Sequence, residues 1–247
     1  MYHLPVTARF FNELGRRVAY FYVRRLMRSD ITWEAEPPKG AKIIAANHPT
    51  TTDPFLAMSW PFEPVYILIT ESAFKVPGVG QFLRLAGHIP VYADRGREAF
   101  DAAVDLLRGG HTVGIFPEGA LSEEGGQMVT GRTGAVRLAT TARVPIVPVG
   151  IALDWHFVNR REIQEFGLQE KMRWFWLGAY EATVGRPLVF EHDPDDREEV
   201  RQSTDILMAA IDGLVEHSAR RLLDASWPRR RGAGEPDAPP ERSRPPG

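Results

Sequence analysis

A histidine and an aspartate stand five residues apart in the segment 47–53, where Pro49 interrupts an extended apolar run. The run 42–46 predicts a buried strand, and Pro49 prevents that strand from simply continuing. His48 and Asp53 are therefore expected on a turn at a strand end. There the imidazole can accept a proton near neutral pH, and the carboxylate can fix its tautomer and stabilise the imidazolium. This pattern predicts a general-base dyad; a structural pair satisfied by the backbone of the turn is the alternative.

The elements that must position the dyad alternate between strands and helices. Runs rich in β-branched and aromatic residues predict strands, and apolar residues at spacings of three and four predict helices. This alternation predicts an α/β fold of a single domain, with a central, mostly parallel β-sheet flanked by helices. The expected strands are 42–46, 65–69, 88–92, 112–116, 144–149 and 182–184. The expected helices are 54–60, a short pair within 74–85, 98–107, 134–141 and 196–223, and the stretch 155–175 shows no regular pattern.

Residues 6–28 predict an N-terminal amphipathic helix with a basic side. Six arginines outweigh the acidic Glu13 and Asp30, so the segment carries about +4. A helix of this kind lies in a membrane interface, and the alternative is a helix packed on the domain with its arginines in solvent. The apolar stripe consists of Phe10, Phe11, Leu14, Val18, Phe21, Tyr22 and Leu26.

Length and composition fit one globular domain with terminal extensions: 247 residues, 43% apolar and 25% charged. We expect residues 1–30 to form the membrane-interface helix, 31–225 the catalytic domain and 226–247 a disordered tail. The absence of cysteine excludes disulfides, thiolate metal sites and a cysteine nucleophile. A net charge of −2 gives no pull toward nucleic acid, and the histidines outside the dyad show no metal-ligand spacing. The chain has no apolar run of about 18 residues, which argues against a membrane-spanning helix.

Further residues with chemical potential stand in the loops at the expected strand ends. They are Arg95, Glu118, Gly119 and Pro148. A base dyad, a cationic anchor and a third carboxylate at the rim of one sheet suit proton abstraction from a hydroxyl held by an anionic group. The serines lack the G-x-S-x-G elbow, which argues against a serine hydrolase.

In order along the chain, these blocks resemble the motifs of the glycerophospholipid acyltransferase family, which comprises the 1-acylglycerol-3-phosphate acyltransferases and their relatives. The segment 47–53 resembles the first motif of that family, N-H-x-x-x-x-D. The second, third and fourth motifs are resembled by 87–95, 116–119 and 144–149, and the segment between the last two by 131–139. Four motifs in order over about residues 40–152 make the resemblance specific, although each alone is a short string.

The resemblance implies an acyl transfer that depends on the dyad. His48 would remove the proton from an acceptor hydroxyl, which attacks an acyl thioester, and Asp53 would orient His48. The co-substrate would be acyl-CoA or acyl carrier protein, with no cofactor and no metal. The acceptor would be a lysophospholipid, 1-acylglycerol-3-phosphate, and the product phosphatidate. The protein would act as a peripheral membrane protein on the cytoplasmic face.

The resemblance also assigns the acceptor site. Arg95 would hold the acceptor phosphate, Glu118 and Gly119 would shape the acceptor site, and Pro148 would support the apolar side of the pocket.

The chain departs from the family just after the third motif. Ala120-Leu121-Ser122 stands where the family commonly has Thr-Arg-Ser, and leucine cannot bind phosphate as an arginine fork does. Arg97 or Arg132 could compensate for that loss. One alternative is therefore an O-acyltransferase for another lipid or glycolipid acceptor. A second alternative, a lipid-binding membrane protein without turnover, fits an intact His48/Asp53 pair less well.

Overall fold

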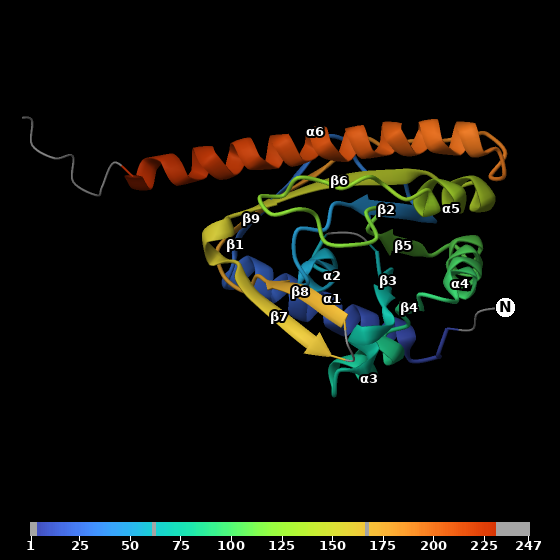
Figure 1. Ribbon diagram of the computed structural model, residues 1–247, viewed down its shortest axis with the longest axis horizontal. Coiled ribbons are helices and arrows are strands. Elements are labelled where there is room, and N and C mark those ends of the chain that lie inside the picture. The colour runs from blue at the N-terminus through green and yellow to red at the C-terminus, as the bar shows by residue number, and fades with distance from the viewer. Residues whose placement is uncertain (1–3, 61–62, 166–167, 231–247) are drawn as a thin grey trace, which may run out of the picture.

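The computed structural model describes residues 4–60, 63–165 and 168–230 (Figure 1). They form a single α/β domain around a seven-stranded sheet, which confirms the expected fold class. Neighbouring strands of this sheet run parallel, except that β6 and β9 are antiparallel. In spatial order the strands are β1 (Arg28–Trp33), β9 (Ala179–Val184), β6 (Ile146–Leu153), β2 (Lys42–Ala46), β5 (Thr112–Ile115), β3 (Val65–Thr70) and β4 (Ile89–Val91).

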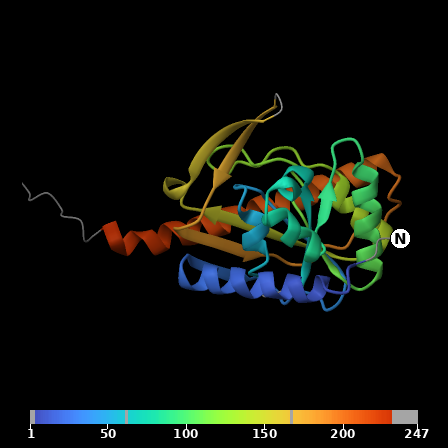
Figure 2. The ribbon, with the colours of Figure 1, turned by 90° about the horizontal axis from the view of Figure 1, so that it is seen from below.

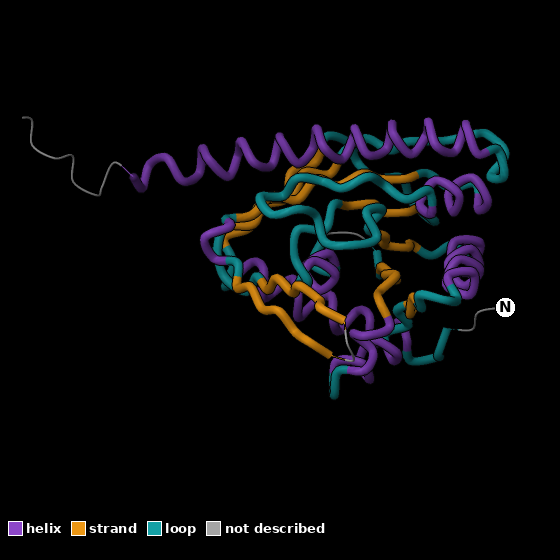
Figure 3. The backbone as a smooth tube through the Cα atoms, in the orientation of Figure 1, coloured by secondary structure: helices purple, strands orange, loops and turns teal. Residues whose placement is uncertain are grey.

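Helices cover both faces of this sheet, as Figure 3 shows. Every residue of the central strand β2 is buried, which explains its continuous apolar sequence. Alternate residues serve opposite cores: Ile44 packs in the cluster that contains α1 residues, and Ile43 in the cluster that contains α4 residues. On the first face lie α1 (Ala8–Arg25), α2 (Asp53–Ala57), the 3-10 helix η1 (Glu71–Lys75) and α3 (Val79–Leu85). On the second face lie α4 (Gly96–Arg108), α5 (Gly134–Ala142) and α6 (Arg197–Arg230).

Helix α1 confirms the predicted amphipathic helix, but its large apolar side chains are not the ones that pack on the domain. Its buried face carries mostly small residues, including Ala8, Asn12 and Ala19. Gly15 permits this close approach, since a Cβ there would lie 2.5 Å from the Phe82 ring. Within the described ranges, no helix is long and apolar enough to cross a membrane. Most of the large apolar stripe faces outward: Phe10, Leu14, Val18, Phe21 and Leu26 are exposed.

Two polar strand regions were not expected from the sequence. Residues 28–30 belong to β1 instead of the N-terminal helix, so the expected domain boundary at residue 30 is wrong and falls inside a strand. The stretch 155–175, expected to be irregular, contains the 3-10 helix η2 (Trp155–Phe157) and an antiparallel hairpin. Figure 2 shows this hairpin projecting from the body of the domain. Its strands are β7 (Asn159–Glu165) and β8 (Leu168–Trp174).

The C-terminal helix is longer than expected. Helix α6 continues to Arg230, so residues 226–230 of the expected disordered tail are helical, and that boundary is wrong as well. The rest of the expected tail, 231–247, lies outside the described residues.

Candidate active site

The structure brings His48 and Asp53 together at the carboxyl end of β2. Nδ1 of His48 lies 2.9 Å from Oδ2 of Asp53, which is fully buried at the start of α2. The imidazole is 17% exposed. Because the carboxylate is an acceptor, the ring proton belongs on Nδ1 and the Nε2 lone pair is left free. No described residue makes a hydrogen bond to Nε2, so the ring can accept a proton from a molecule at this edge.

The loop 47–53, called the dyad loop below, fixes its own carboxylate. Thr50 donates twice to Asp53, from its backbone N–H at 2.7 Å and from its hydroxyl at 2.6 Å. Asn47 ties the loop to β6, because its side chain exchanges two hydrogen bonds of 2.7 and 2.9 Å with the backbone of Ile151. The sequence analysis did not predict these supporting roles of Asn47 and Thr50. The polar run after the strand could have indicated them, since Asn and Thr side chains form hydrogen bonds with nearby backbone groups at turns.

The loop 116–123, called the third-motif loop below, lies against the dyad loop. Glu118 is 2% exposed and does not face outward. Its Oε1 accepts the backbone N–H of His48 at 2.8 Å and the hydroxyl of Ser122 at 2.7 Å. The N–H of Ser122 donates to the carbonyl of His48 at 2.8 Å. Glu118 therefore holds the backbone of the histidine, a role that the sequence did not reveal.

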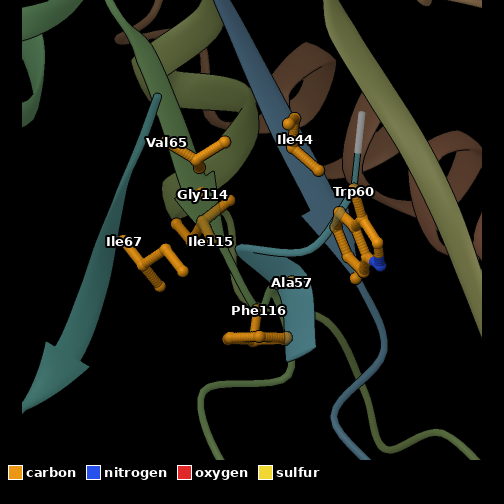
Figure 4. A pocket seen from close by; sticks show the side chains of 9 residues that line it. Ile44, Ala57, Trp60, Val65, Ile67, Gly114, Ile115 and Phe116 are labelled. Atoms are coloured by element: carbon orange, nitrogen blue, oxygen red, sulfur yellow. The ribbon is translucent and has the colours of Figure 1, made fainter. Parts of the chain in front are cut away.

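Phe116 joins the dyad to an apolar hollow. Its ring stacks on the His48 imidazole with centroids 4.2 Å apart and planes 18° from parallel. The same ring lines a small apolar hollow of about 10 Å³ between the sheet and α2 (Figure 4). The imidazole and an apolar space thus share one wall. The other lining residues are Ile44, Ala46, Ala57, Trp60, Val65, Ile67, Gly114 and Ile115.

Gly119 and Arg132 form a second contact at the third-motif loop. Gly119 has a φ of +64°, a left-handed conformation that favours glycine. The Arg132 side chain lies directly against it, because a Cβ on Gly119 would be 2.6 Å from Nε and 2.9 Å from Cζ. Arg132 is exposed and, within the described chain, no carboxylate pairs with it. A guanidinium thus lies one residue away from Glu118, which contacts His48.

Arg95 lies farther along the same edge. It follows β4, three strand spacings from β2, which is roughly 14 Å at about 4.8 Å each. Its guanidinium stacks 4.0 Å from the centre of the Tyr92 ring. Two carboxylates, those of Asp94 and Glu98, lie 3.7 and 3.6 Å from it. Arg95 is therefore half-exposed and partly neutralised, whereas Arg132 is closer to the dyad in the fold.

Pro148 is not brought to the hollow. It lies within β6 in register with Ala45, and its carbonyl accepts the N–H of Gly185 at 2.9 Å. Arg97, the other cation considered for the acceptor, pairs with Asp101 at 2.9 Å on α4. In the described structure, neither residue makes a hydrogen bond or an ion pair with the dyad loop or the third-motif loop.

The described part of the chain contains no group of three or more His, Cys, Asp or Glu placed to hold a metal ion. Its functional groups are a carboxylate-held imidazole, an apolar hollow beside that imidazole, and a guanidinium on the adjoining loop. At the carboxyl edge of an α/β sheet, this set can supply a general base, an apolar contact and a contact for an anion.

Residues 22–152, just over half of the chain, match the family model described as Acyltransferase. The chain belongs to that family.

Curated relatives include two 1-acyl-sn-glycerol-3-phosphate acyltransferases. The protein from Borreliella burgdorferi is 30% identical over 135 residues, which are 53% of this chain and 54% of that protein. The protein from Saccharomyces cerevisiae is 28% identical over 142 residues, 54% of this chain and 46% of that protein. The chain thus spans about half the length of the curated relatives that it matches.

Among solved structures, the 1-acyl-sn-glycerophosphate (LPA) acyltransferase PlsC from Thermotoga maritima is similar, with a TM-score of 0.58. The two chains are 22% identical, and the similarity covers 86% of this chain and 80% of that one. At this identity the similarity shows a shared fold.

Proposed function

We propose that this protein transfers a fatty acyl group from an acyl thioester, acyl-CoA or acyl carrier protein, to the hydroxyl of 1-acylglycerol-3-phosphate. The product is phosphatidate, and the reaction is a step of phospholipid biosynthesis. One observation carries the proposal: the imidazole of His48, with Nε2 free, stacks on the ring of Phe116, which also lines the apolar hollow. The hollow of about 10 Å³ would have to widen to admit an acyl chain, and a chain that enters beside Phe116 would bring its thioester carbonyl to the base.

The chemistry then follows from the dyad. Nε2 of His48 takes the proton of the acceptor hydroxyl as its oxygen attacks the thioester carbonyl, and Asp53 stabilises the imidazolium that forms. The new C–O bond forms, the C–S bond breaks, and the imidazolium returns the proton to the leaving thiolate. A thioester is already activated, so direct transfer needs no covalent enzyme intermediate. A positioned base contributes typically about 10²–10⁴-fold, and orientation supplies much of the rest.

Arg132 is our candidate for the acceptor phosphate, with Arg95 at the outer end of the site. The guanidinium of Arg132 lies on Gly119 beside the dyad and has no carboxylate partner among the described residues. It could therefore supply the bidentate phosphate contact that Leu121 cannot make. The Ala120–Leu121 segment also favours a second candidate, the same acyl transfer to another lipid or glycolipid acceptor.

We propose further that α1 holds the protein on the membrane surface. Phe10, Leu14, Val18 and Phe21 of α1 are exposed although the helix is packed on the domain. Tyr22 of α1 donates to the carbonyl of Trp176, where the exposed Trp176 and Leu177 continue the apolar surface. The exposed Arg17 and Arg24 of the same helix suit anionic lipid headgroups at the cytoplasmic face.

Thiol release from acyl-CoA, measured with and without lysophosphatidate, tests the reaction in the wild type and in His48→Gln. We expect release that depends on the acceptor and is lost in the variant. Acceptor-dependent release by His48→Gln at the wild-type rate would contradict the mechanism. If lysophosphatidate is inactive, radiolabelled acyl transfer over other lipid and glycolipid acceptors tests the second candidate.

Arg132→Met tests the phosphate contact. A hydrogen bond to a charged group contributes about 1.5–3 kcal/mol, so the KM for lysophosphatidate should rise by about 10- to 100-fold. The KM for monoacylglycerol, an acceptor without a phosphate, should be unchanged. Arg97→Met is the matched control, because Arg97 is also exposed but pairs with Asp101. An unchanged KM in Arg132→Met would remove Arg132 from the site.

A further inference from the structure

An arginine from outside the family match reaches the candidate site. Arg173 lies in β8, beyond residues 22–152, and is only 9% exposed. Its Nη1 donates to the carbonyl of Glu123 at 3.2 Å, and its Nη2 donates to the carbonyl of Ser122. The guanidinium also lies 5.5 Å from the centre of the Trp155 ring. A buried fork on two successive carbonyls holds the third-motif loop in one place.

The backbone of the same residue is bonded to the dyad loop. Thr51 N–H donates to the Arg173 carbonyl at 2.7 Å, and Arg173 N–H donates to Thr51 Oγ1 at 3.2 Å. On the other side, Ser122 N–H donates to the carbonyl of His48. Arg173 thus joins the two loops whose side chains hold the imidazole. A relative movement of these loops would turn Nε2 away from the acceptor.

Arg173 also balances charge. Asp53 and Glu118 are buried carboxylates, one at the ring of His48 and the other at its backbone N–H. A nearby cation stabilises two buried negative charges, because burial removes the water that would otherwise solvate them. Burial lowers the pKa of Arg173, and the negative charges of Glu124, Asp53 and Glu118 oppose that change. The like charge of the exposed Arg160 acts in the same direction as burial, and Tyr180 is a buried group whose pKa is raised by burial and by Asp53.

We propose that Arg173 is a positioning residue for the acyl transfer, an inference that rests on the proposed function. Its fork locks the third-motif loop onto the dyad loop, and its positive charge offsets the two buried carboxylates. The β7–β8 hairpin thereby supplies a guanidinium beside Ala120–Leu121, a segment that has no arginine of its own. The fork acts on the orientation of His48 and should appear in kcat. The charge acts on protonation and should appear in the acid limb of the pH profile.

Two substitutions separate the fork from the charge. Arg173→Met removes both, and we expect kcat to fall about 10- to 100-fold, since a misplacement of about 1 Å can lower the rate 10²-fold. Its KM for lysophosphatidate should be unchanged, and its acid limb should move to higher pH, because protonation near the dyad becomes easier. Arg173→Lys keeps the charge without the fork, so it should restore the wild-type acid limb while kcat stays low.

Arg160→Met is the matched control. Arg160 faces Arg173 in the register of the hairpin, but its side chain is 53% exposed and pairs with Glu124. We expect wild-type kcat and a wild-type pH profile. A loss of activity equal to that of Arg173→Met would assign the effect to the hairpin in general and overturn the proposal.

Three other results would overturn it: Arg173→Met with wild-type kcat, a low kcat with an unmoved acid limb, or a raised KM with kcat unchanged. If Arg173→Met shows no cooperative thermal unfolding, Arg173→Lys decides alone. A low kcat with the wild-type acid limb then supports the proposal, and a wild-type kcat or a shifted limb overturns it. Failure of the proposed function is distinguishable, because it would appear in the wild type and in His48→Gln before any Arg173 variant is measured.

Discussion

The exposed apolar stripe of α1 gives a quantitative prediction about membrane binding. The perturbation is the double substitution Phe10→Ser and Phe21→Ser, because these side chains are 66% and 63% exposed and face away from the domain. Full burial of a phenylalanine contributes about 1.5–3 kcal/mol. About two thirds of each ring is available to a membrane, so each substitution should remove about 1–2 kcal/mol of binding free energy.

The two losses together correspond to a fall in vesicle partitioning of at least about 30-fold. The assay is co-sedimentation with phosphatidylcholine vesicles, with and without phosphatidylglycerol. The domain should remain folded, since substitutions of exposed side chains usually change stability by about 0.5 kcal/mol or less. Thermal unfolding of both proteins checks this point.

The matched control changes two equally exposed apolar residues of α6, Ile206→Ser and Leu223→Ser. Helix α6 covers the opposite face of the sheet from α1 (Figure 1), so a membrane under α1 does not reach it. We expect wild-type partitioning for the control. Equal partitioning of the wild type and the Phe10/Phe21 variant would refute the assignment of α1 to the membrane surface.

Two further predictions concern the fold. Burial lowers the pKa of His88 from 6.5 to about 4, so the unfolded chain binds a proton below about pH 6.5 that the folded protein accepts only near pH 4. The stability that this group contributes is therefore complete above about pH 6.5. It falls by about 1.4 kcal/mol per pH unit, roughly 3 kcal/mol in all, as the pH drops toward 4. In urea unfolding, the free energy of unfolding of His88→Gln should depend less steeply on pH than that of the wild type, and parallel curves would contradict this. Asn12→Ala should lower the free energy of unfolding by about 1–3 kcal/mol, because the buried Asn12 amide donates to the carbonyls of Val65 and Ala86; an unchanged urea midpoint would show that α1 is not fastened to the sheet at this point.

Much of the fold was predictable because its central strands are buried on both faces and therefore read as continuous apolar runs. Strand β2 is such a run, and the change to polar residues at Asn47 marks the loop that carries the dyad. The strands β1, β7 and β8 lack this signal. They lie at the edge or outside the main sheet, where polar residues are favoured and no apolar alternation is required.

The supporting residues could not be predicted from local patterns. Arg173 is 122 residues from Thr51 in sequence, and only the fold brings them together. Which side of α1 is exposed could not be predicted for another reason. Periodicity identifies the apolar stripe, but the domain selects the small face, because Gly15 and Ala19 allow a closer approach than phenylalanine.

The central claim is that His48 acts as a base because the Asp53 carboxylate holds the ring proton on Nδ1 and stabilises the imidazolium that forms. The most direct measurement is kcat for acceptor-dependent thiol release by Asp53→Asn, which has nearly the same shape. The oxygen of Asp53 that faces Nδ1 also accepts the backbone N–H of Thr50, so the substituted amide keeps its carbonyl oxygen at that place and the tautomer is retained. The variant therefore loses only the negative charge that stabilises the imidazolium. We predict that kcat falls by about 10²–10⁴-fold while the KM for lysophosphatidate is unchanged. A kcat equal to that of the wild type would contradict the mechanism.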